Sequence, residues 1–302
     1  MWNHYSMIGF PVELGDDHWP LRAVREGEEI DVDAGSYHVL RSNSGAELWA
    51  SVSRKRGVDF GPHFAGATRC PLLLAGRLRG ESRFECGFEA LGADTTPDPE
   101  SPQRFGPDRD AAARDHLLLA LDATRGARTR WRSARSRLGR GSTLLDELGR
   151  YDSDDMAMFE VVFDAFDARL HKDLELPTVA DVQLAAFAQD CRWHSSEADF
   201  FAWLESEDLD RFRDAFIPHR HFDPSEEARA VATISATVLD TADCENELTG
   251  LRFRWARVGT AVGELDIVAP SATDGQPVVG GLVYGRVWLS GRIVAQHTPN
   301  PA

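Results

Sequence analysis

The chain has 302 residues, 42% of them hydrophobic, and a formal net charge of −16 at pH 7. This apolar content is sufficient for a folded core and excludes a chain that is disordered throughout. The negative charge argues against a protein that coats nucleic acid or an anionic membrane with its whole surface. No apolar run approaches the roughly 20 residues that a membrane-spanning helix needs.

Short strands are predicted for the first ninety residues. Apolar and polar residues alternate in 83–90 and again in 46–52. Period-2 alternation places one set of side chains on a buried face and the other in water. We therefore predict an N-terminal β module over residues 1–108, which a further strand over 158–166 would complete.

Residues 109–150 differ in composition from the rest of the chain. They hold ten arginines against five acidic residues, together with glycines that would cap or break helices. We interpret this stretch as an Arg-rich helical insertion or linker.

A helical segment is predicted over residues 178–218. Thr178 and Asp181 have the spacing of a capping box, and Ser196 with Asp199 marks a second helix start. Between these two starts, apolar residues recur at the helical spacing i, i+3, i+4, i+7: Leu184, Phe187, Ala188 and Cys191.

The C-terminal residues 228–295 return to strand patterns. Glycines interrupt the last strand pattern, 280–291, as they do at bulges and in the tight coiling of small barrels. About five short strands predict a β-barrel-like module. The predicted fold class is therefore α+β, with two small β-barrel-like (OB-like) modules and a helical segment between them.

The cysteines predict a reducing compartment. The four cysteines are far apart and form no C-x-x-C pair, which disfavours a zinc knuckle. Residues 1–12 lack the basic start and long apolar stretch of a signal peptide. We therefore expect reduced thiols in a cytoplasmic protein; two disulfides are the alternative for a secreted chain.

Several segments carry a resemblance to other proteins. They lie in both halves of the chain: 45–49, 62–66, 182–188, 195–200, 216–218, 246–253, 264–269 and 287–292. In these segments the chain resembles a group of uncharacterised bacterial two-module β-rich proteins. The resemblance implies no activity, because that group has none assigned, and the Arg-rich stretch lies outside it.

The strongest candidate metal site is His219, His221 and Asp223. In an extended strand the three side chains would project from one face, and two imidazoles with a carboxylate suit zinc or iron. The alternative is an exposed connector, because Pro218 and Pro224 bracket the segment. No cofactor other than such a divalent metal is predicted.

A second acidic cluster is predicted not to form a site. Asp164, Asp167 and His171 would share a face only on a helix, whereas the alternation in 158–165 places Asp164 on a strand. His63 is predicted to be structural.

The Arg-rich stretch is a candidate anion-binding site. On a helix, Arg125, Arg128, Arg132 and Arg135 share a face, and guanidinium groups suit phosphate oxygens. Trp131 could stack on a base. The alternative is that these arginines pair with the acidic remainder of the chain or stay hydrated.

Common catalytic patterns are missing from the sequence, including G-x-x-x-x-G-K-[ST], G-x-S-x-G and H-E-x-x-H. The leading hypothesis is a cytoplasmic, non-enzymatic binding or scaffold protein with a protein partner and no membrane association. The alternatives are a metal-dependent enzyme that uses His219, His221 and Asp223, and nucleic-acid binding through residues 125–140.

Overall fold

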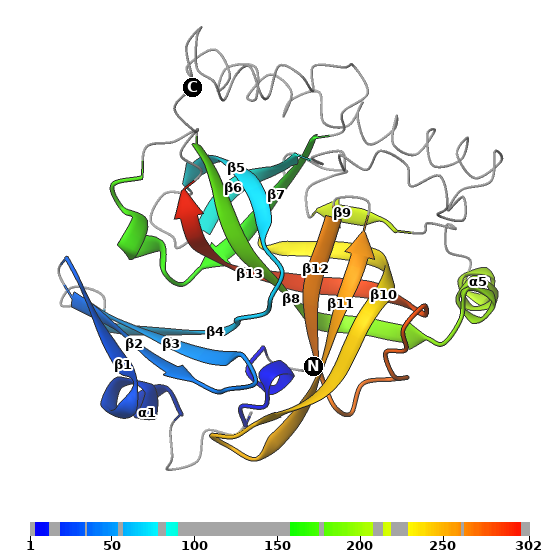
Figure 1. The fold of residues 1–302 in the computed structure, drawn as a ribbon, viewed down its shortest axis with the longest axis horizontal. Helices are drawn as coiled ribbons and strands as arrows, with labels where there is room; N and C mark the ends of the chain where they lie inside the picture. Colours follow the sequence, from blue (N-terminus) through cyan, green and yellow to red (C-terminus); the bar gives the residue numbers. More distant parts are fainter. Residues whose placement is uncertain are drawn as a thin grey trace, which may run out of the picture.

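The protein consists mostly of β-strands with few helices, which confirms the β-rich class (Figure 1). The helices are η1 (Ser6–Ile8), α1 (Trp19–Glu26), η2 (Ala168–His171) and α5 (Glu197–Ser206). The computed structural model describes residues 4–11, 19–33, 35–53, 57–77, 83–89, 158–174, 178–207, 214–218, 229–260 and 263–296. Within those ranges no helix is long and apolar enough to cross a membrane.

A small antiparallel sheet is formed by the first strands of the chain. Its order is that of the sequence: β1 (Glu28–Val32), β2 (Gly35–Arg41), β3 (Ala46–Ser53) and β4 (Gly57–Phe64). Helix α1 packs on one face, where Ala23 joins Leu40, Leu48 and Ala50 in a shared apolar cluster. The other face turns toward the large sheet.

The large sheet has nine strands in the order β11-β12-β8-β5-β6-β7-β13-β10-β9. In chain order they are β5 (Cys70–Arg77), β6 (Arg83–Glu89), β7 (Met158–Ala165), β8 (Thr178–His194), β9 (Phe216–Pro218), β10 (Val231–Asn246), β11 (Leu251–Thr260), β12 (Gly263–Pro270) and β13 (Leu282–Gln296).

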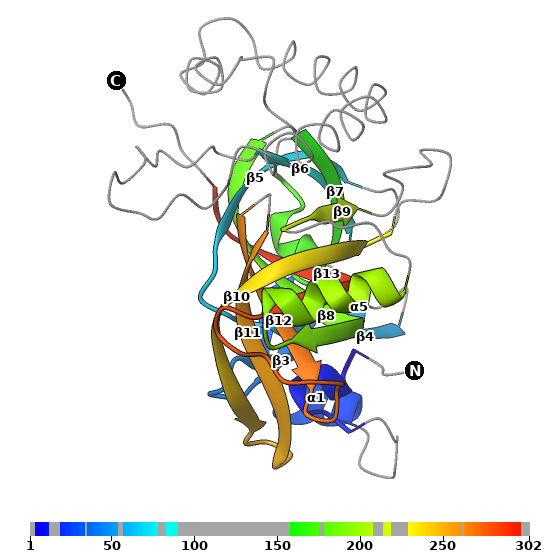
Figure 2. The ribbon, with the colours of Figure 1, turned by 90° about the vertical axis from the view of Figure 1, so that its right-hand side faces the viewer.

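Two further pairings turn this order into two rings that share β8 and β13. Pairing of β10 with β11, together with β8 with β13, joins β8, β12, β11, β10 and β13 in one ring. The same β8–β13 pair closes a second ring through β5, β6 and β7. Figure 2 shows the two groups of strands stacked along the long direction of the view.

Glycines let the shared strand β13 bend. Gly285 has φ +149° beside a register shift between Arg286 and Val287, which matches the bulge predicted from the glycine-rich run. At Gly291, a Cβ would overlap the ring of Phe163 on β7. The absence of a side chain there allows β13 and β7 to pack closely.

The helix predicted to begin at Thr178 is wrong, because residues 178–194 form β8. Ala185, Ala186, Phe187 and Ala188 are all buried, so both faces of the strand are covered. A strand buried on both faces reads as a continuous apolar run, which hides the period of 2 and matches helical spacing by coincidence.

The second predicted helix start is confirmed at α5. The Ser196 side chain accepts a hydrogen bond from the Asp199 amide at 3.2 Å. Within the predicted helical segment 178–218, helix is limited to 197–206 among the described residues, and 216–218 is strand β9.

Strand pairing does not follow the two predicted modules. The sheets divide between β4 and β5, and β5 and β6 join the large sheet with the C-terminal strands. Strand β7 pairs with β6, as predicted for 158–166, with Phe84 opposite Phe163. The long insertion between β6 and β7 therefore interrupts a hairpin of the large sheet.

Candidate functional site

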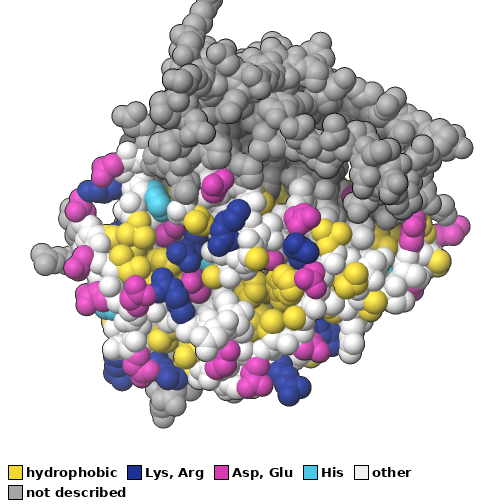
Figure 3. Space-filling view, viewed as in Figure 1, with side chains coloured by type: hydrophobic (Ala, Val, Ile, Leu, Met, Phe, Trp, Pro, Cys, Tyr) yellow, Lys and Arg dark blue, Asp and Glu magenta, His cyan; other side chains and the backbone are white. Residues whose placement is uncertain are grey.

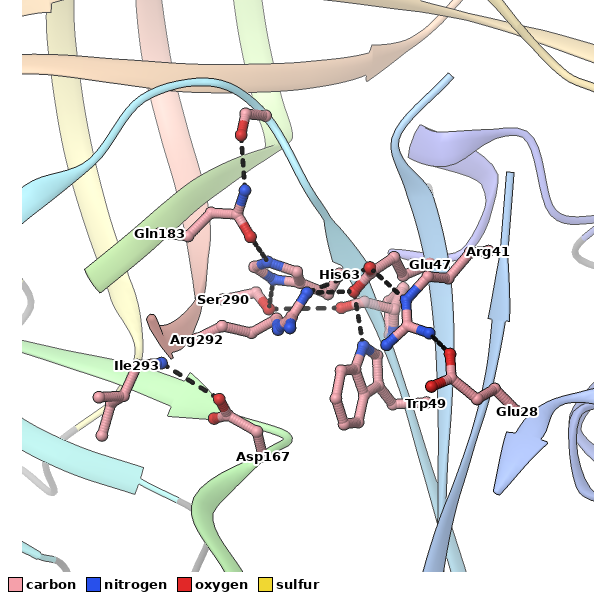
Figure 4. Close-up of polar contacts among 12 residues, drawn as sticks. Glu28, Arg41, Glu47, Trp49, His63, Asp167, Gln183, Ser290, Arg292 and Ile293 are labelled. Carbon is pink, nitrogen blue, oxygen red and sulfur yellow. Dashed lines mark hydrogen bonds and ion pairs between the residues drawn. The ribbon is translucent and has the colours of Figure 1, made fainter. Parts of the chain in front are cut away.

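A buried polar cluster lies where β4 of the small sheet meets β8 and β13 of the large sheet. We call it the inter-sheet cluster; it contains Glu47, Trp49, His63, Gln183, Ser290 and Arg292 (Figure 4). Glu47 and His63 lie on neighbouring strands, directly opposite each other in the β3–β4 register. Their side chains therefore leave the same face of the small sheet.

Glu47 is the acceptor on which this cluster converges. Its side chain is buried, and Arg292 donates to both carboxylate oxygens at 3.1 Å. Arg41 donates to Oε1 at 3.1 Å, and the Trp49 indole donates to Oε2 at 2.8 Å. Charge-assisted bonds from two guanidinium groups offset the cost of burying the carboxylate.

Charged side chains of alternating sign extend from the buried Glu47 carboxylate to the protein surface. The guanidinium groups of Arg292 and Arg41 lie 5.0 and 5.9 Å from the centre of the Trp49 ring. Arg41 also pairs with Glu28, an exposed residue of β1. Because both guanidinium groups are paired with the Glu47 carboxylate, this arrangement connects strands of the two sheets.

His63 is hydrogen-bonded at both ring nitrogens. Nδ1 lies 2.9 Å from Ser290 Oγ, and Nε2 lies 3.4 Å from Gln183 Oε1. The Gln183 amide nitrogen donates to the Gly66 carbonyl at 2.5 Å, so Oε1 is the end that faces the imidazole. His63 is therefore protonated at Nε2, and the Ser290 hydroxyl donates to Nδ1.

Burial is the main influence on the His63 imidazole and lowers its pKa to about 4. Glu47 acts in the opposite direction, and Arg292 adds to the lowering. A neutral imidazole next to a hydroxyl is the base–nucleophile pair of acyl transfer. Both His63 and Ser290 are 0% exposed, however, so this pair meets no substrate in the folded protein.

A second set of contacts joins the sheets through η2. The buried Asp167 accepts a hydrogen bond from the Ile293 amide at 3.1 Å. Two residues further on, Arg169 donates to the carbonyls of Val52 at 3.1 Å and Asp33 at 2.8 Å. Because Asp33 directly follows β1, this guanidinium fixes the end of the β1–β2 hairpin.

The two edge strands of the small sheet, β4 and β1, differ in whether their outward backbone groups are covered. On β4, the Phe60 and Pro62 carbonyls point away from β3. The Phe60 carbonyl accepts a hydrogen bond from Tyr5 Oη at 3.3 Å, and Ser290 Oγ lies 3.4 Å from the Pro62 carbonyl oxygen. Proline at 62 has no amide hydrogen, so no donor is left unpaired where this edge meets the large sheet. The β4 edge is therefore closed.

The edge at β1 is open among the described residues. Val32 and Gly35 pair across the turn and exchange backbone hydrogen bonds, as do Ile30 and Tyr37. The backbone groups of Glu29 and Asp31 therefore point away from β2. Both side chains are exposed. Figure 3 shows acidic and basic side chains interspersed over the part of this face that carries the small sheet.

The predicted metal and anion sites lie outside the described residues: His219, His221, Asp223, Arg125, Arg128, Arg132 and Arg135. Among the residues that the structure describes, no three His, Cys, Asp or Glu side chains are grouped so as to hold a metal. Asp164 lies on β7, as predicted, and accepts from the Trp288 indole at 2.6 Å. His171 contacts Asp167 at 3.2 Å.

Trp49 and Trp288 are buried, Trp255 is half-buried, and His63 is fully enclosed. The sequence did not reveal that indoles and carboxylates pair; Trp255 likewise donates to Asp266 at 2.8 Å. Only the Glu47–Trp49 pair had a local signal, since residues two apart on a strand share a face. The other partners come together through tertiary structure.

Comparisons with known proteins found no matching family model, no similar curated protein and no similar solved structure.

Proposed function

We propose that the chain is a non-enzymatic binding protein that pairs its open edge strand, β1, with an extended segment of a protein partner. The observation that carries this proposal is the outward direction of the backbone groups of Glu29 and Asp31. Such an edge offers main-chain hydrogen bonds to an added strand, a common mode of peptide recognition.

Contacts at both ends of β1 hold the strand in place. Glu28 at its start pairs with Arg41, and Arg169 binds the Asp33 carbonyl at its end. A preorganised edge loses less conformational entropy when a partner binds. The inter-sheet cluster contributes indirectly, because it ties the small sheet to the large one.

The cysteines support the proposed cytoplasmic location. Cys70, Cys191 and Cys244 are free thiols. Burial raises the pKa of both Cys70 and Cys191 to about 12, so these thiols stay protonated and unreactive at neutral pH. Protonated, buried thiols suit a reducing compartment.

The rings of strand pairing support the proposed barrel-like architecture. Each ring has five strands, the size of a small barrel, and closure of this kind removes sheet edges. Outside the rings, the large sheet ends at the three-residue strand β9, and the small sheet contributes the longer edge strand β1.

The binding proposal is tested by selecting randomised octapeptides displayed on phage against the full chain. Asp31→Pro removes the outward amide hydrogen while the β1–β2 bonds remain, because those bonds are made by residues 28, 30 and 32. Asp31→Ala is the matched control that keeps this amide. We expect enriched peptides that bind the wild type and the Ala variant and lose binding to the Pro variant; equal binding to all three would contradict the proposal.

The absence of catalysis at the inter-sheet cluster is tested with a fluorophosphonate probe of reactive serines. We expect no labelling of Ser290 in the native protein, because the residue is fully buried. Labelling at Ser290 that disappears in His63→Gln would instead establish a working nucleophile.

A further inference from the structure

The two faces of β1 differ in chemistry. Glu29 and Asp31 are opposite His38 and Ser36 and leave the sheet on the α1 side. Both of these acidic side chains are exposed, and neither forms an ion pair with another residue that the structure describes.

The other face of β1 is apolar toward its end. Ile30 and Val32 are half-buried and pack against the cluster of Tyr37, Val39 and Trp49. An added strand would continue this face, because neighbouring strands place directly opposite residues on the same side of a sheet.

From this alternation, and resting on the proposed function, we propose that β1 selects a basic extended segment of a partner protein, in which Lys or Arg alternates with apolar residues. The basic side chains lie beside Glu29 and Asp31. The apolar side chains extend the cluster at Ile30 and Val32. Opposite charges on directly paired strand residues are stabilising, and like charges are destabilising.

The same acidic pair disfavours a second copy of this chain as the occupant. If two β1 strands paired antiparallel around Ile30, Glu29 of each copy would face Asp31 of the other. Five residues of strand also offer little area to compensate for such repulsion. The charge of the edge therefore favours a different, basic chain.

The test uses two heptapeptides that share a Val framework, one with three alternating Arg and one with three alternating Glu. Fluorescence anisotropy with the full chain at low salt is expected to show at least about tenfold tighter binding of the Arg peptide. High salt is expected to reduce that preference. Equal binding of the two peptides would overturn the inference.

Charge-neutralised variants separate this edge from the general negative charge of the protein. Glu29→Gln with Asp31→Asn is expected to weaken binding of the Arg peptide about fivefold. Asp240→Asn with Asp274→Asn is the matched control, because it changes the net charge equally at exposed acids on β10 and in the loop after β12. Equal weakening by both pairs would also overturn the inference.

The outcomes distinguish this inference from the proposed function. If the selected peptides are uncharged and lose binding to the Asp31→Pro variant, the proposed edge binding is supported and the proposed preference for basic segments is contradicted. If no displayed peptide binds, both the proposed edge binding and the proposed preference for basic segments are contradicted. Unchanged unfolding midpoints of the variants show that the differences arise from binding.

Discussion

At the residue scale, Glu47 shows how this fold accommodates a buried charge. Its carboxylate is almost fully enclosed, yet every contact is a donor: an indole and two guanidinium groups. Removing the partners of a buried ion lowers the stability of the folded protein far more than removing those of an exposed ion, because water cannot replace the lost partners. Glu26, which pairs with Arg22 on the surface of α1, provides the comparison.

We predict that Glu47→Gln lowers the free energy of unfolding by about 2–4 kcal/mol. The substitution keeps the size of the side chain but leaves Arg292 without its counter-charge. Glu26→Gln removes an exposed i,i+4 pair and is expected to cost about 0.5 kcal/mol or less. Urea unfolding of both variants measures the difference, and similar losses would contradict the role assigned to Glu47.

His63 gives a pH dependence of known sign. Its pKa is about 4 in the folded protein, against an ordinary value of 6.5. The unfolded chain therefore binds a proton that the folded protein rejects as pH falls below 6.5. The contribution to stability is fully present above pH 6.5 and is lost progressively down to about pH 4, by about 3 kcal/mol in total.

We predict that His63→Gln removes this contribution to the slope of unfolding free energy between pH 6.5 and 4. Because burial lowers the pKa of His4 to about 4 as well, the wild-type slope contains both residues. The difference between the wild-type and variant curves isolates His63. Parallel curves over this range would show that the imidazole is not held neutral in the fold.

At the element scale, β8 and α5 show what local patterns can and cannot predict. The start of α5 was predicted correctly, because a capping serine acts through residues three positions away. Strand β8 was mistaken for a helix, because its partners are distant: it pairs with β5, β12 and β13. Burial on both faces removes the polar half of the alternation that identifies a strand.

The cap of α5 can be tested directly. Ser196→Ala removes the acceptor of the Asp199 amide and is expected to destabilise the protein by about 1 kcal/mol. Ser195→Ala, one residue earlier, keeps the backbone amide that donates to the Asp199 carboxylate and is expected to have little effect. Thermal or urea unfolding compares the two, and an equal effect would argue against a specific cap.

At the scale of the whole molecule, the small sheet is held to the large one by close packing as well as by polar contacts. Gly61 on β4 is a point of close approach, because a Cβ there would overlap the ring of Phe166, just after β7. Phe166 also meets the Trp288 ring edge-on, at 6.0 Å between centroids. One aromatic side chain thus connects both sheets.

We predict that Gly61→Ala destabilises the protein by about 2–3 kcal/mol through overlap with Phe166. Phe166→Ala is expected to cost about 2 kcal/mol through lost packing. The double variant should be more stable than the sum of the two losses implies, by at least about 1 kcal/mol, because removing the ring relieves the overlap. Strict additivity would show that the two residues do not meet in solution.

The sequence by itself determined the features that depend on near neighbours along the chain. These are the β-rich class, the alternating strands β3, β6 and β7, the cap of α5 and the glycine-marked bend of β13. Each is encoded within a few residues, through side-chain periodicity, a capping hydroxyl or the conformational freedom of glycine.

Only the tertiary structure decided the rest. It identified β8 as a strand, joined β5 and β6 to the C-terminal strands, and brought His63 to Ser290 across 227 positions of sequence. It also closed the β4 edge while leaving β1 open. These outcomes depend on which distant segments pack together, and no local pattern of polarity or charge specifies such long-range pairing.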